Sequence, residues 1–114
     1  MSTPQERLQL ISDAHSKAKA RIPSDLLKVE SDAQKAEVLH NFFKLDVQLA
    51  KAQLEALDAN GAAVEDAHSK AKKAQEDIDA AYKTAKAIAE KIRLGGKVVT
   101  SITNLVRKAK KAEA

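Results

Sequence analysis

Apolar residues recur at alternating three- and four-residue steps through the middle of the chain. The first stripe, which includes one histidine, consists of Leu26, Val29, Ala33, Ala36, His40, Phe43, Val47, Ala50, Leu54 and Leu57. The second stripe consists of Val64, Ala67, Ala71, Ala74, Ile78, Ala81, Ala85, Ile88 and Ile92. Such spacing places the residues on one side of an α-helix, as at the core positions of a coiled coil. It therefore predicts two long helices.

Local start and stop signals divide the chain into four predicted helices. Thr3-Pro4-Gln5-Glu6 has the form of a capping box with proline at the first helical position. Pro23 disfavours helical geometry in the residue before it, and Ser24 is a good cap for a second helix. Asn60-Gly61 and Gly95-Gly96 are typical of helix ends. The sequence therefore predicts one domain with helices over about 4–21, 25–58, 62–94 and 97–110.

The two stripes mirror each other about the turn near Gly61, and this symmetry predicts that their helices pair antiparallel. In the resulting register Leu54 meets Ala67 and Ala33 meets Ile88, so that large side chains face small ones. We expect an all-α fold centred on a long, coiled-coil-like antiparallel hairpin with an Ala-rich seam. A shorter N-terminal helix and an amphipathic C-terminal helix would complete a three- or four-helix bundle at its base.

The second predicted helix carries another apolar stripe, on the side opposite the first. It consists of Val38, Phe42, Leu45, Leu49, Ala52 and Ala56. Helices that fold back at Pro23 and at Gly95-Gly96 would cover only the base of the hairpin. We therefore expect a bare apolar face near its tip and predict Phe42, Leu45, Leu49 and Ala52 as the partner or dimer face. The alternative is that a shifted N-terminal helix covers these residues.

Positive charge collects in the C-terminal half of the chain. The net charge is +4, with 8 Lys and Arg against 9 Asp and Glu in residues 1–60, and 12 against 7 in residues 61–114. The last predicted helix has an apolar side formed by Val98, Val99, Ile102, Leu105, Val106 and Ala109. Its predicted basic surface consists of Lys97, Arg107, Lys108, Lys110 and Lys111. Such a helix either packs its apolar side on the hairpin or lies on an anionic membrane.

The sequence offers little chemistry for catalysis or for a cofactor. It has no Cys, and Gly95-Gly96 lacks the residues that complete a phosphate-binding loop. Glu37-Val38-Leu39-His40 and Glu65-Asp66-Ala67-His68 both have the Glu-x-x-His spacing of di-iron bundles. In the hairpin register, however, the two histidines would lie roughly 20 Å apart along the axis. We therefore expect no metal, no cofactor and no enzymatic activity.

These patterns predict a non-enzymatic helical protein–protein interaction module: an adaptor, inhibitor or assembly subunit that acts through apolar helix faces. Its partner would be another protein or a second copy, in a dimer or higher oligomer. The alternative is a peripheral membrane or anionic-surface binder that uses the basic C-terminal helix. Nonspecific nucleic-acid binding is a third class, although no recognition helix or aromatic stacking set is evident. With no signal-peptide pattern and no apolar span of about 18 residues, a cytoplasmic location is expected.

Overall fold

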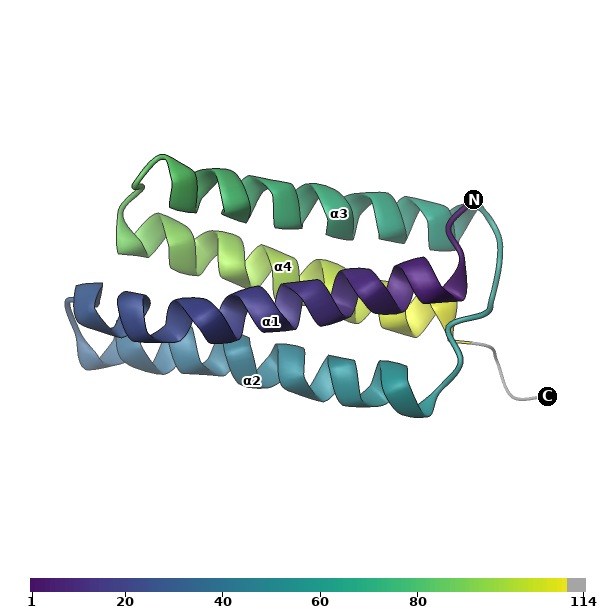
Figure 1. Cartoon of the computed structure of the whole chain (residues 1–114), viewed down its shortest axis with the longest axis horizontal. Helices are drawn as coiled ribbons and strands as arrows, with labels where there is room; N and C mark the ends of the chain where they lie inside the picture. Colours follow the sequence, from purple (N-terminus) through teal and green to yellow (C-terminus); the bar gives the residue numbers. More distant parts are fainter. Residues whose placement is uncertain (111–114) are drawn as a thin grey trace.

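The computed structural model describes residues 1–110, and these form a bundle of four α-helices (Figure 1). The helices are α1 (Pro4–Lys28), α2 (Asp32–Leu54), α3 (Ala62–Lys83) and α4 (Ile88–Ala109). Successive helices run in opposite directions along the bundle, so α2 and α4 are parallel to each other. The described residues contain no strand. The prediction of an all-helical fold that packs as a bundle is therefore confirmed.

The pairing of the helices differs from the predicted hairpin. α1 packs on α2, α3 packs on α4, and α2 also packs on α4. Among the described residues the backbones of α2 and α3 do not come close to each other, and the two helices lie on opposite sides of the bundle (Figure 1). The predicted pairing of the second and third helices is therefore wrong.

The connection between α2 and α3 explains this difference, because it is not a tight turn. α2 ends at Leu54, Leu57 is buried, and the Ala59 N–H donates to the Ala109 carbonyl at 2.9 Å. The chain thus passes across the end of α4 before α3 begins. That crossing places α3 on the far side of α4 from α2.

α1 continues through Pro23 and ends at Lys28, beyond the predicted end near residue 21. A proline inside a helix removes one backbone hydrogen bond and crowds the preceding turn. The segment after it is nevertheless held by packing, since Asp25 is buried and accepts a hydrogen bond from the Tyr82 hydroxyl at 2.6 Å. The second helix then begins after Ser31, whose side chain accepts from the Gln34 N–H, instead of after Ser24.

The predicted helix break at Gly95-Gly96 is also wrong, because α4 runs straight through it. The reversal between α3 and α4 occurs at residues 84–87, where Ala85 has a positive φ of 53°. Gly95 serves a different purpose: a Cβ at this position would lie 2.9 Å from Asn41 Nδ2. Its missing side chain lets α2 and α4 approach closely, and the Asn41 amide donates to the Ile92 carbonyl at 3.2 Å.

The core is built around α4. Its predicted apolar side is buried throughout: Val98, Val99, Ile102, Leu105, Val106 and Ala109. The predicted stripe of α3 is buried from Val64 to Ala81, but it packs on α4 instead of α2. The Ala residues of this stripe keep α3 close to its neighbour.

The face that we expected to be bare is largely core. Leu45 and Ala52 are only 3% and 6% exposed, while Phe42 and Leu49 are half-buried. α1 extends far enough past Pro23 to pack along α2 and cover these residues. The prediction of an uncovered face at Phe42, Leu45, Leu49 and Ala52 is therefore wrong. The alternative holds: the N-terminal helix covers these residues.

Pro23 gives a direct test of the long α1. Replacing Pro23 with Ala restores a backbone donor and removes the crowding, so it should raise the free energy of unfolding by about 1–2 kcal/mol. Pro4→Ala is the matched control, because proline is favourable at the first helical position and its loss should change stability little. Urea unfolding followed by circular dichroism measures both. A Pro23→Ala variant no more stable than the parent would argue against a helix through this residue.

Candidate protein interaction face

The residues predicted as a basic surface lie on the outside of α4. Lys97, Arg107, Lys108 and Lys110 are exposed, whereas Lys111 lies outside the described residues. Lys110 Nζ lies 3.3 Å from a carboxylate oxygen of Glu55. Because the apolar side of α4 is enclosed by the bundle, this helix offers only its polar side to an outside surface.

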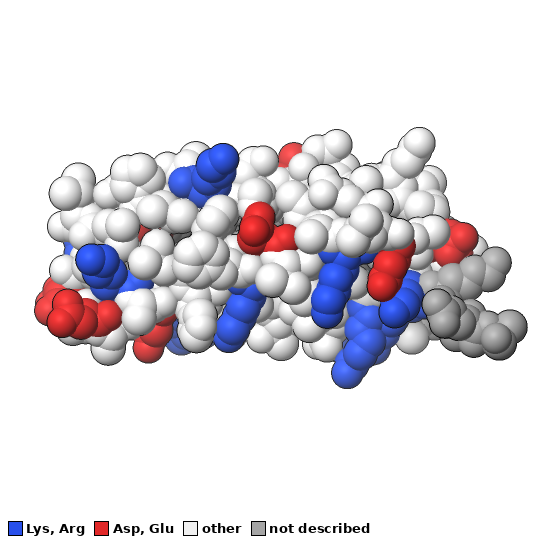
Figure 2. All heavy atoms as spheres, turned by 90° about the horizontal axis from the view of Figure 1, so that it is seen from below, with Lys and Arg blue, Asp and Glu red and all other residues white. Residues whose placement is uncertain are grey.

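The apolar surface that α2 does expose is the stripe assigned by sequence to the hairpin. Phe43, Val47 and Leu54 are 55%, 52% and 87% exposed. With their exposed neighbours they form what we call the outer stripe: Ala33, Ala36, His40, Phe43, Val47, Ala50 and Leu54. Figure 2 views the bundle from the α2 side and shows a largely uncharged surface, with Lys and Arg gathered mainly along its lower edge.

A row of rings positions the central residue of the outer stripe. Phe43 lies 5.8 Å from Phe42, and Phe42 lies 5.0 Å from His15 of α1, measured between ring centroids. His15 Nε2 also lies 2.9 Å from an Asp46 carboxylate oxygen. Phe42, which packs on α1, thus supports the ring of Phe43, while Phe43 itself remains exposed.

A buried arginine ties one end of the bundle together. Arg7 is fully buried, and its guanidinium donates to the Leu57 carbonyl at 2.6 Å and the Ala59 carbonyl at 2.9 Å. It also donates to the Ser2 carbonyl and to Glu65 at the start of α3. These bonds join the N-terminus, the 55–61 connection and α3. Arg7 therefore has a structural role.

The opposite half of the bundle contains a buried polar cluster. Lys91 is 4% exposed, and no described carboxylate lies within ion-pairing distance of its Nζ. Burial lowers the Lys91 pKa, and the neighbouring Lys28 charge adds to this effect. The Tyr82 hydroxyl donates to Asp25, and burial together with that carboxylate raises the Tyr82 pKa. The other carboxylate oxygen of Asp25 has no hydrogen-bond partner in the described residues.

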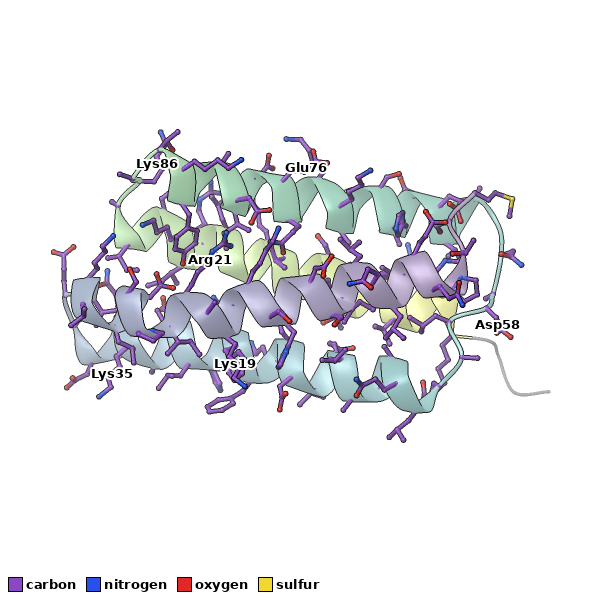
Figure 3. All side chains as sticks on the ribbon, viewed as in Figure 1. Lys19, Arg21, Lys35, Asp58, Glu76 and Lys86 are labelled. Carbon is purple, nitrogen blue, oxygen red and sulfur yellow. The ribbon has the colours of Figure 1, made fainter. Side chains whose placement is uncertain are left out.

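Arg21 borders this cluster from α1. Its guanidinium lies 4.1 Å from the centre of the Tyr82 ring and pairs with Asp79 at 2.8 Å. Figure 3 shows its side chain reaching away from the α1 ribbon, consistent with that pairing on α3. The cavity beside the cluster has a volume of about 50 Å³. It has room for a few waters, far less than the several hundred Å³ of an ordinary small-molecule pocket.

The residues of α1 that face the core, polar and apolar together, are regularly spaced in the sequence. Arg7, Ile11, Ala14, Ala18, Arg21 and Asp25 alternate four- and three-residue steps and are buried or half-buried. This rhythm passes through Pro23 without changing phase, so it signals that the helix continues. Three of these residues are charged, so the spacing of apolar residues alone does not reveal the continuation of the helix.

The described residues show neither a metal centre nor a membrane span. No group of three or more His, Asp or Glu side chains among them is arranged to hold a metal ion. His40 and His68 lie on α2 and α3, on opposite sides of the bundle. None of the four helices is long and apolar enough to cross a bilayer.

Comparison with protein families, curated proteins and solved structures finds no match to this chain. Its function is inferred from the exposed surfaces of the bundle.

The pairing of Glu65 predicts a pH dependence of stability. The Ser2 backbone N–H donates to Glu65 at 2.6 Å and, with the Ser2 hydroxyl and Arg7, lowers the Glu65 pKa to about 2. An unfolded glutamate has a pKa near 4.3, so this group stabilises the fold above about pH 5, and the contribution is lost as the pH falls toward 2. Urea midpoints should therefore fall less steeply between neutral and acid pH for Glu65→Gln than for the parent.

The control is Glu76→Gln. Glu76 projects from the same helix into solvent (Figure 3) and forms no ion pair in the described part of the chain. Its variant should keep the parent's dependence on pH. Equal slopes for Glu65→Gln and the parent would contradict the role given to the Ser2–Arg7–Glu65 contacts.

Proposed function

We propose that this chain is a non-enzymatic helical interaction protein that associates through the outer stripe of α2. The supporting observation is the concentration of exposed apolar side chains there. Of the five large apolar side chains that the described residues expose, three lie on this stripe: Phe43, Val47 and Leu54. Single exposed apolar residues are ordinary, but a continuous stripe on one helix is typical of a surface that pairs with another helix.

The size pattern of the outer stripe fits a second copy of the chain. Its first half is small, with Ala33 and Ala36, and its second half contains Val47 and Leu54. Two antiparallel α2 helices related by a two-fold axis near Leu45 would place Phe43 against Val47, His40 against Ala50 and Ala36 against Leu54. Each large residue then meets a smaller one, as a self-complementary two-fold interface requires.

The charges beside the stripe are compatible with this arrangement. Glu37 and Lys51 flank it on the same side and would face each other twice across the two-fold axis. Lys44 lies between them and would meet its own copy, at a small cost because both side chains are exposed. Most of the association energy then comes from apolar burial, and the dimer should persist at high salt.

Membrane binding receives less support, whether through α4 or through the outer stripe. A membrane binder that inserts α4 would have to extract its buried apolar side from the core. The residues that flank the outer stripe on one side, Glu37, Lys44 and Lys51, carry charges of both signs, whereas an interfacial membrane helix typically has a strongly basic polar face.

Sedimentation across a concentration series tests the proposal. The parent should form a dimer that persists at high salt, and Phe43→Glu combined with Val47→Glu should give a folded monomer. The expected cause is the burial of two charges in an apolar interface. A parent that stays monomeric throughout the series would overturn the proposal.

Two matched variants separate surface from core effects. Leu27→Glu changes an apolar side chain of α1 that is 88% exposed, and it should leave the dimer intact. Leu45→Glu places a charge on the buried side of α2 and should unfold the chain. Circular dichroism of all variants shows which of them remain helical. Equal loss of the dimer in Leu27→Glu would contradict a role specific to the outer stripe.

A further inference from the structure

A second concave surface lies beside the outer stripe, on the face formed by α2, α4 and α3. It is a hollow of about 780 Å³ to which α1 contributes no lining residue. We call it the basic hollow, because five cationic side chains line it: Lys44, Lys70, Lys73, Arg93 and Lys97. Asp77 is the one acidic residue among its lining.

The hollow follows from the arrangement of the helices. The backbones of α2 and α3 stay apart in the described residues, so the outer surface of α4 is open between them. At this level α4 carries Gly96, where an added Cβ would meet nothing within 4 Å. Ala74, Leu94 and Val99 lie at the bottom of the hollow, but they are only 8%, 9% and 7% exposed. The result is a narrow floor of mostly covered apolar side chains, with cations from three helices around it.

The cations of the hollow are weakly satisfied within the chain. Lys73 pairs with Asp77 and Arg93 with Glu90, while Lys70 lies 3.0 Å from Asp66. Each of the three pairs joins two exposed residues of the same helix, two pairs on α3 and one on α4. Such exposed pairs stabilise a protein little. Lys44 and Lys97, which face the hollow from α2 and α4, form no ion pair in the described part of the chain.

We propose that the basic hollow binds an acidic amphipathic helix of a protein partner. The lysines on both flanks complement Asp and Glu of such a helix, and the narrow apolar floor between them complements one row of small apolar side chains. Residues 69–77 of α3 and 93–101 of α4 bound the hollow, a length of about 12 Å or two helical turns. Since no aromatic side chain lines it, the hollow lacks the platform on which single-stranded nucleic acids stack.

This site borders the outer stripe, because Lys44 lines the hollow and would also meet its own copy in the proposed dimer. The hollow assigns the chain a second partner. If α2 pairs with a second copy, each dimer presents two basic hollows. The two proposals can fail independently, because neither Phe43 nor Val47 lines the hollow and the double variant Phe43→Glu, Val47→Glu leaves its lining residues unchanged.

The test uses a fluorescently labelled helical peptide of about 14 residues, with a Leu and Ala stripe flanked by Glu. A scrambled peptide of the same composition and a single-stranded oligonucleotide of equal charge are compared with it by anisotropy. The amphipathic peptide should bind more tightly than both, and its affinity should fall with added salt. The double variant on α2 should bind it as well as the parent does.

Three variants locate the binding. Lys44→Glu and Lys97→Glu should each weaken binding about five- to tenfold, because each replaces an attraction with a repulsion. Gly96→Leu should weaken it by filling the floor, and the new side chain has open space on α4. Lys108→Glu, an exposed charge reversal on the same helix outside the hollow, should have little effect.

Several results would overturn the proposal. Absence of peptide binding, or equal binding of the scrambled peptide, would show that the hollow does not recognise an amphipathic helix. Tighter binding of the oligonucleotide would assign the surface to nucleic acid. An effect of Lys108→Glu as large as that of Lys97→Glu would mean that only the overall charge matters.

Discussion

The packing of α4 between α2 and α3 is the interaction on which the rest of the structure depends. Ile102 and Leu105 of α4 are fully buried, and α3 lays an almost continuous Ala stripe against this helix. Because α4 occupies the middle, α2 and α3 cannot meet. That separation leaves the outer stripe of α2 without a neighbour inside the chain, and it leaves the basic hollow open between the two helices. Both candidate surfaces therefore follow from the position of α4 between α2 and α3.

The sequence predicts the helical content and several faces correctly, for physical reasons that are local. The capping box at Thr3 forms as expected, and the apolar sides of α3 and α4 are the sides that face the core. Each of those helices has one continuous apolar side, so its inward direction follows from the spacing alone. The start of α3 after Gly61 is equally local, because a glycine with a positive φ precedes it.

The pairing of α2 could not be predicted in this way, because α2 is apolar on two opposite sides. Which side is buried depends on the length of α1, and Pro23 makes the sequence predict too short a helix. A local rule ends the helix there, but the buried Asp25 and its bond to Tyr82 hold the next turn in place. Gly95 and Gly96 wrongly indicate the end of a helix for a similar reason. Their lack of side chains serves the approach of Asn41 and the open floor of the hollow, and neither role is visible without the neighbouring helix.

The order of the helices also bears on how the chain folds. α1 with α2, and α3 with α4, are neighbours in sequence, so each pair can form through contacts between residues close along the chain. Chains dominated by such contacts fold quickly, because little loop entropy is lost before packing begins. The two pairs are joined through α2 and α4, whose contacts link residues far apart along the chain. Of the bonds that the buried Arg7 makes, the one to Glu65 joins α1 to α3, so it can form only once the two pairs have docked.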